Sequence, residues 1–143
     1  MVEIARGLTE RHRTLRPKVA ELAALALRLD ELPAGEAVAQ LEQTRRMIEW
    51  ELLPHEDEEQ RTAYPLIEQV LSGENPTGPL IQTHAEIRRL SRLYARLLGH
   101  QTGPGVTGES LRDVRRVLYG LHAVLTLHFA QEDELYSLLA EES

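Results

Sequence analysis

Apolar residues recur along the chain at spacings of three and four, which is the period of an amphipathic helix. The first apolar stripe extends from the start of the chain to residue 32 and contains Leu8, Leu15, Val19, Leu22, Ala26 and Leu29. A Pro-Ala-Gly sequence at residues 33–35 ends it. Alternating runs of β-branched and aromatic residues, which indicate strands, are nearly absent. The pattern therefore predicts an all-α protein.

The second helical stretch covers residues 36–71 and contains two prolines. Its apolar side is formed by Val38, Leu41, Ile48 and Leu52. Proline lacks a backbone N–H and its ring clashes with the preceding turn, so we expect a kink near Pro54 and a kink or break near Pro65.

Two further helices follow after turn-rich segments. Residues 72–79 form a linker rich in Gly, Pro and Asn, and the third helix is expected over residues 80–98. The Gly-rich segment 99–108 leads to a fourth helix over about 111–140, which Ser110 or Thr107 could cap. Four amphipathic helices joined by short loops predict an up-down-up-down four-helix bundle.

The chain also repeats itself at an offset of 72 or 73 residues. LTERH, which ends at His12, aligns with LIQTH, which ends at His84. The His-x-x-x-Glu of the second stretch aligns with the His-x-x-x-Glu of the fourth helix, and a tyrosine follows each. We therefore expect one domain over residues 1–143, built from two similar helical hairpins (about 8–71 and 80–140) with approximate two-fold symmetry.

The composition excludes several classes of function. The 143 residues are 42% hydrophobic and 27% charged, which is enough for one domain with a core. A formal net charge of -7 disfavours nucleic-acid binding through a basic face. The absence of cysteine excludes disulfides, thiolate metal sites and iron–sulfur clusters. We expect a cytoplasmic protein, because neither a signal peptide nor an apolar run long enough to cross a membrane is visible.

Two His-x-x-x-Glu pairs are the first candidates for metal ligands. Residues four apart lie on the same face of a helix, so His55 with Glu59, and His128 with Glu132, can each direct two donors at one site. A carboxylate has two oxygens and can bridge two metals, which makes the two glutamates natural bridges.

Two further histidines lie on apolar stripes. His12 continues the stripe of the first helix, and His84 lies with Ile81 and Ile87 on the third. Imidazoles and carboxylates buried without partners cost several kcal/mol, so a converging set is best satisfied by cations. Imidazole and carboxylate ligands without sulfur suit iron, manganese or zinc. The mirrored arrangement of the ligands favours two metal ions over one.

Taken singly, each of these residues has a simpler explanation. A histidine on an apolar stripe is usually a hydrogen-bonded core residue, but here coincidence would have to act six times. His122 lies about 120° from the face of His128 and is interpreted as a hydrogen-bond partner, while His100 is expected to be exposed. Trp50 is interpreted as a core residue. The tyrosines are interpreted as packing residues, one of which could supply an oxygen ligand that the sequence does not single out: Tyr64, Tyr94, Tyr119 and Tyr136.

The whole pattern resembles the hemerythrin-like, or HHE cation-binding, family. The resemblance covers nearly the whole chain and rests on the segments TERHRTLRP, ELLPHEDEEQRTAYPLI, THAEIRRL and LHAVLTLHFAQEDELY. It implies a four-helix bundle that holds a non-haem di-iron pair with an oxo or hydroxo bridge, although manganese and zinc accept the same donors. By position, the implied ligands are His12, His55, Glu59, His84, His128 and Glu132.

The chain departs from the oxygen-carrying hemerythrins at the position of Arg88, where those proteins have another histidine. A guanidinium cannot replace that ligand, although its charge could stabilise a bound anion or peroxide. This chain is similar here to iron-sensing members that lack the same histidine. In those members the glutamate directly after the second histidine binds metal, and Glu56 holds that position. Helix geometry slightly favours Glu58. We prefer Glu56, because Pro54 can distort the turn.

A second departure concerns the last ligand. In the carriers it is an aspartate five residues after its histidine, and Asp133 holds that position here. We prefer Glu132, which matches the first repeat.

Three functions are compatible with these residues. The first is a di-iron protein that binds or reduces dioxygen, peroxide or nitric oxide, and such reactivity could amount to an enzymatic activity. The second is a module that senses iron or oxygen, or handles iron, through a partner chain. The third is a structural bundle with relict histidines. We rank them in this order, and the sequence leaves the oligomeric state open.

Overall fold

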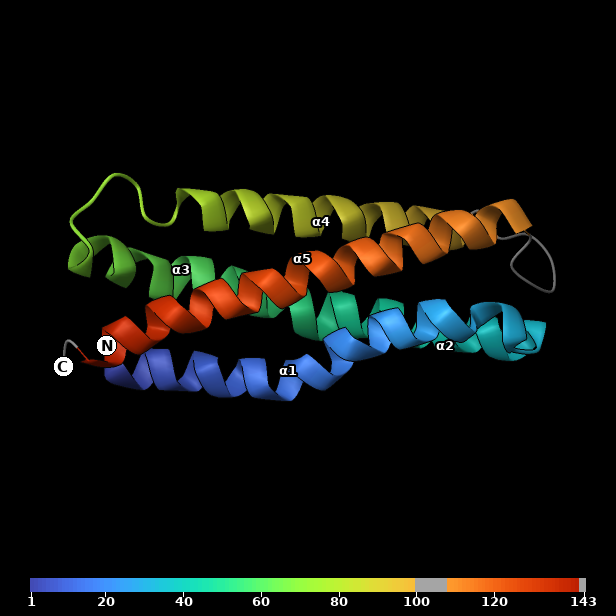
Figure 1. The fold of residues 1–143 in the computed structure, drawn as a ribbon, viewed down its shortest axis with the longest axis horizontal. Coiled ribbons are helices and arrows are strands. Elements are labelled where there is room, and N and C mark those ends of the chain that lie inside the picture. The colour runs from blue at the N-terminus through green and yellow to red at the C-terminus, as the bar shows by residue number, and fades with distance from the viewer. Residues whose placement is uncertain (100–107, 142–143) are drawn as a thin grey trace.

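The chain forms four long helical rods in a computed structural model that describes residues 1–99 and 108–141 (Figure 1). The first rod is α1 (Val2–Arg28), which is extended by the short 3-10 turn η1 (Leu29–Glu31). The remaining elements are α2 (Ala34–Met47), η2 (Ile48–Leu52) and α3 (Leu53–Val70), which together make one continuous rod, then α4 (Gly78–Gly99) and α5 (Gly108–Glu141). No strand occurs in the described residues.

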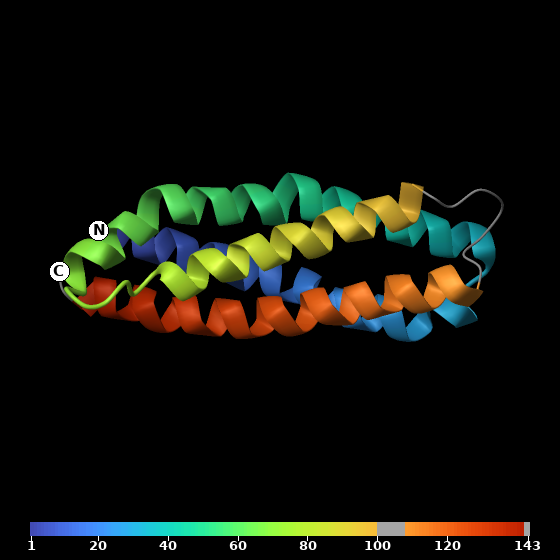
Figure 2. The same ribbon diagram turned by 90° about the horizontal axis from the view of Figure 1, so that it is seen from above.

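The rods run alternately up and down the bundle. The start of α1, the end of α5 and the connection between α3 and α4 lie at one end, and the turn from α1 into α2 lies at the other (Figures 1 and 2). The all-α bundle predicted from the hydrophobic pattern is confirmed. None of the described helices combines the length and the apolar character that crossing a membrane requires.

The irregularity predicted near Pro54 is a π-helical turn. The backbone N–H of Leu53 bonds to the carbonyl of Ile48, five residues back, in place of the usual four. Pro54 then enters α3 in its first turn, where the missing N–H of proline is tolerated. The break considered at Pro65 does not occur, since α3 continues through it to Val70.

A layer of buried histidine and glutamate side chains, called the polar layer, divides the core of the bundle into two apolar clusters. Each rod contributes to both clusters. To the larger cluster, α1, the second rod, α4 and α5 contribute Leu15, Leu52, Ile87 and Leu125, respectively. To the smaller cluster, they contribute Leu8, Ala63, Leu80 and Tyr136 in the same order. Every rod thus passes from one cluster to the other. Burial of these side chains holds the rods together on both sides of the layer, so the polar residues between them are fixed in place.

The connection between α3 and α4 is ordered by its own contacts. The Glu68 carboxylate accepts hydrogen bonds from the backbone N–H of Thr77, at 3.2 Å, and from its hydroxyl. Asn75 has a left-handed φ of 55°. A Cβ at Gly78 would collide with the Asn75 side chain, so a larger residue where α4 begins would require that side chain to move.

Four residues that the sequence pattern placed on packing faces lie at the surface. Trp50 is 73% exposed, Val38 and Tyr119 are 40% exposed, and Ile81 is 38% exposed. The prediction that Trp50 is a core residue was wrong, because Ile48 and Leu52 take the buried positions of η2.

The predicted caps of the fourth helix also differ from the structure. Ser110 lies inside α5, which begins at Gly108, and therefore does not cap it. Thr107 lies outside the described residues.

Candidate metal centre

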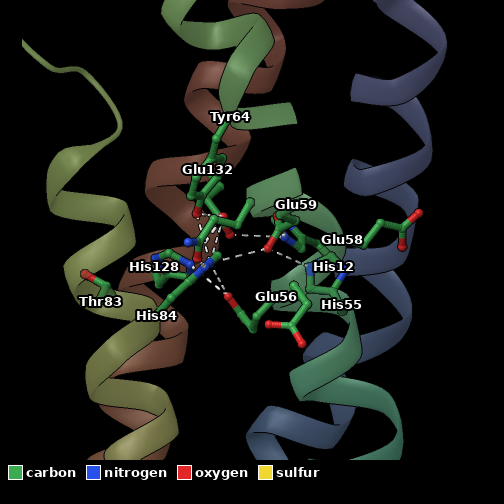
Figure 3. A network of polar contacts seen from close by, with 12 residues as sticks. His12, His55, Glu56, Glu58, Glu59, Tyr64, Thr83, His84, His128 and Glu132 are labelled. Carbon is green, nitrogen blue, oxygen red and sulfur yellow. Dashed lines mark hydrogen bonds and ion pairs between the residues drawn. The ribbon is translucent and has the colours of Figure 1, made fainter. Parts of the chain in front are cut away.

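Seven polar side chains from all four rods converge in the layer between the two apolar clusters (Figure 3). All are at most 1% exposed: His12, His55, Glu56, Glu59, His84, His128 and Glu132. The structure thus brings together the six residues of the repeat pattern and Glu56. Glu58, the alternative to Glu56, is half-buried and its carboxylate points away from the layer in Figure 3.

The donor atoms fall into two groups, each compact enough for one metal ion. Within each group the candidate ligand atoms all lie within 4.8 Å of one another. The larger group consists of Glu56, Glu59, His84, His128 and Glu132, and the smaller of His12, His55 and Glu59. Glu59 belongs to both groups, as a bridging carboxylate would.

The second His-x-x-x-Glu carboxylate also reaches both groups. Glu132 Oε1 lies 3.3 Å from His12 Nε2, and Glu132 Oε2 lies 3.2 Å from His128 Nε2. Glu59 likewise reaches both groups, with its Oε2 at 3.0 Å from His12 Nε2 in the smaller group and its Oε1 at 3.8 Å from His84 Nε2 in the larger. Two carboxylates therefore link the two groups.

Glu56 faces two histidines of the larger group. Its Oε2 contacts His84 Nε2 and lies 3.2 Å from His128 Nε2. Arg88 lies farther out, with its Nη2 at 3.2 Å from Gln60 Oε1 and from Asp57 Oδ1. The carboxylate, and not the guanidinium, faces the donors of the larger group.

Two buried tyrosines bind the linking carboxylates crosswise. The Tyr64 hydroxyl donates to Glu132 Oε2 at 2.5 Å and lies 2.9 Å from His84 Nε2. The Tyr136 hydroxyl donates to Glu59 Oε2. Burial and the charges of the nearby glutamates raise the pKa of both phenols, so both remain protonated donors. The sequence pattern had marked these tyrosines only by their place after each His-x-x-x-Glu.

The carboxylates of the layer raise the pKa values of the histidines beside them. Burial lowers the pKa of His12, but its contacts with the Glu132 and Glu59 carboxylates outweigh burial and raise that pKa to about 10. Burial also lowers the pKa of His128, but the Glu132 and Glu56 carboxylates outweigh burial and raise that pKa to about 10. Burial raises the pKa of Glu56, and hydrogen bonds from His128 and His84 nevertheless bring it below its ordinary value. Cations that bind here would replace the protons on the histidines.

Several buried donor atoms lack a hydrogen bond within the described part of the chain. They are Nδ1 and Nε2 of His55, Nδ1 of His128, and Oε1 of Glu56, Glu59 and Glu132. Buried polar atoms are rarely left without a partner, because the lost hydration is not recovered. His55 Nε2 and the three carboxylate oxygens are donors that a cation would use, so the residues fit metal ions with a preference for nitrogen and oxygen.

The other two histidines stand apart from these groups. His122 is half-buried and lines a cavity of about 270 Å³ together with Arg16 and Phe129. The ring of Phe129 stacks on that of His12, with centroids 4.3 Å apart. His100 lies outside the described residues.

Residues 3–140 match the family described as Hemerythrin HHE cation binding domain. No curated protein and no solved structure matches the chain. The match includes every residue of the polar layer.

Proposed function

Because the chain belongs to the hemerythrin HHE cation-binding family, we propose that its polar layer binds two iron ions and that this centre reacts with a small oxidant: dioxygen, peroxide or nitric oxide. The observation that carries the proposal is the division of seven buried donors into two groups that share Glu59. Bound iron would supply electron transfer and Lewis acidity. The remaining steps depend on residues of the chain.

We assign the donors to two unequal metal positions. His84, His128 and Glu56 serve the first position only, and His12 and His55 serve the second only, while both positions share Glu59 and Glu132. The second set contains two histidines and the two shared carboxylates, which are nitrogen and oxygen donors of the kinds that non-haem iron sites use. It has fewer protein donors than the first, so an external ligand would enter there.

The surroundings of the second position favour a small reactant. Phe129 stacks on His12 and also lies edge-on to His55, with ring centroids 6.0 Å apart. The same phenyl ring lines the cavity beside Arg16. An apolar ring at this place excludes bulk water and large molecules. The Tyr136 hydroxyl, which donates to Glu59, holds a proton beside one of the shared carboxylates.

The test is the metal content of protein purified without added metal, together with the absorption spectrum of the same sample. We expect two irons per chain, the near-ultraviolet bands of a bridged diferric pair, and consumption of added peroxide. A matched control is Glu58→Gln, which should leave all three unchanged because Glu58 points away from the layer. Less than about one metal per chain, or zinc alone, would contradict the redox function.

A sensing or iron-handling role is the second candidate, and one observation favours it. The donors come from all four rods, so metal occupancy is coupled to the packing of the whole bundle. Ligands that bind only the folded state stabilise it, by about 4 kcal/mol when present at a thousand times Kd. Removal of the metal by chelation should then lower the melting temperature strongly. An unchanged melting temperature would contradict this role.

A further inference from the structure

The two histidines related by the repeat have their outer ring nitrogens held by different chemical groups. His12 Nδ1 lies 2.7 Å from Asp133 Oδ1, and His84 Nδ1 lies 3.0 Å from Gln60 Oε1. Each partner directly follows the His-x-x-x-Glu of the opposite half of the chain. The two positions are therefore equivalent in the repeat, but one holds a carboxylate and the other a neutral amide.

An arginine completes each of these arrangements. Arg16, four residues after His12, pairs with Asp133 Oδ2. Arg88, four residues after His84, contacts Gln60 Oε1 at 3.2 Å. Histidine, outer partner and arginine thus recur in both halves, and the charge of the outer partner is the feature that differs.

Asp133 can contact the outer nitrogen of His12 because the Asp133 side chain does not point into the layer. Glu132 takes the inward position, and the next residue along a helix is turned by about 100°. The Asp133 side chain is 24% exposed, whereas that of Glu132 is fully buried. The aspartate that stands in sequence where the carriers have a ligand therefore contacts the back of a histidine.

A carboxylate behind a metal-binding histidine changes that ligand. A histidine that binds through Nε2 carries its proton on Nδ1, and an acceptor there fixes the tautomer and the orientation of the ring. A charged acceptor also makes the imidazole a stronger donor, and loss of such partners typically weakens metal binding about 10- to 100-fold.

We propose that Asp133 is a positioning residue that strengthens the metal position of His12 and His55 and makes it distinct from the position of His84 and His128. Each position then has one carboxylate of its own. Glu56 acts directly at the position with the neutral Gln60, and Asp133 acts through His12 at the position with fewer donors. This inference rests on the proposed di-iron function.

The experiment is an anaerobic titration of the metal-free protein with Fe(II) against a competing chelator, which resolves two binding constants. In Asp133→Asn, which keeps the shape and the acceptor but removes the charge, we expect one constant to fall about 10- to 100-fold and the other to remain. In a His55→Ala background, where only the larger group of donors is intact, the same substitution should leave the remaining constant unchanged. Equal losses at both positions, or no loss, would overturn the inference.

Two further variants separate this role from a purely structural one. Arg16→Gln removes the surface ion pair but leaves the carboxylate on His12, so both Fe(II) constants should persist. If Arg16→Gln reproduces the loss, the inference is wrong. Gln60→Glu adds a carboxylate behind His84 and should increase the Fe(II) binding constant at the position of His84 and His128. This variant tests the effect of an outer carboxylate even if circular dichroism shows that Asp133→Asn does not fold. Failure of the wild type to bind two Fe(II) would instead contradict the proposed function.

Discussion

The Tyr64 hydroxyl donates a hydrogen bond to Glu132, a carboxylate 68 residues away in the opposite half of the chain. Tyr136 does the same for Glu59, so each helical hairpin holds the linking carboxylate of the other. These bonds tie the shared donors of the two proposed metal positions to side chains from both halves. Removal of either hydroxyl should therefore affect both stability and the metal centre.

Tyr64→Phe should lower the free energy of unfolding of the metal-free protein by about 1.5–3 kcal/mol, because a buried charged acceptor loses its donor. Urea unfolding measures this loss, and the near-ultraviolet bands of the iron-loaded variant should shift. Tyr94→Phe is the matched control, since the Tyr94 hydroxyl donates to the Leu41 carbonyl in the larger apolar cluster. It should lower stability without shifting the bands. Identical spectra for the two variants would contradict the assigned role of Tyr64.

Ligands of one position and shared ligands should differ in their effect on iron content. His55→Ala removes a donor of the smaller group only, so one iron per chain should remain. Glu59→Gln removes charge from a residue that belongs to both groups and should reduce the content below one. Elemental analysis of purified protein gives both numbers. Equal iron content in the two variants would argue against a shared carboxylate.

Glu56 and Glu58 form a matched pair on one helix. Glu56→Gln should weaken iron binding at the position of His84 and His128, because Glu56 Oε2 contacts both imidazoles. Glu58→Gln should bind iron like the wild type. The measurement is Fe(II) affinity by chelator competition. A loss in Glu58→Gln, with none in Glu56→Gln, would reverse the assignment.

The stability of the metal-free protein should fall as pH rises from about 6.5 to about 10. The pKa values of His12 and His128 are raised from 6.5 to about 10 in the folded chain. Stabilisation from a raised pKa is fully present below the unfolded value and disappears as pH passes the folded value. Glu56 and Glu132 have lowered pKa values, so their contribution is instead lost in acid.

Urea unfolding at a series of pH values, with and without bound iron, measures this dependence. Iron replaces the protons on the histidines, so the stabilisation that iron adds should grow over the same range of pH. His12→Gln should show a shallower fall in the metal-free state. A flat profile between pH 6.5 and 10 would show that the histidines are not held protonated by the carboxylates.

The sequence pattern predicted the rods and the members of the layer, because residues four apart must share a helix face and apolar stripes must face the core. His12, for example, could be placed in the core by its neighbours Leu8 and Leu15 alone. The offset repeat then related the two halves. These inferences need only the geometry of single helices and the symmetry of the chain.

Contacts between rods could not be predicted in the same way. The bonds from Tyr64 to Glu132 and from Asp133 to His12 depend on how the rods are rotated and which of them are neighbours. The π-helical turn before Pro54 required knowledge of the backbone. The exposure of Trp50 did not: hydrophobicity alone suggested burial, but Trp50 lies two residues from both Ile48 and Leu52 and is therefore turned about 200° away from their buried face.

The polar layer also prevents the rods from sliding past one another. Apolar stripes alone would tolerate a shift of α1 by one helical turn, about 5.4 Å, because leucine would again meet leucine. Such a shift would bring Leu8 or Arg16 to the place of His12, opposite Glu59 and Glu132. Either exchange leaves buried carboxylates without their imidazole partner. The residues of the polar layer therefore fix the axial register of the rods, and they define a single alignment of the helices.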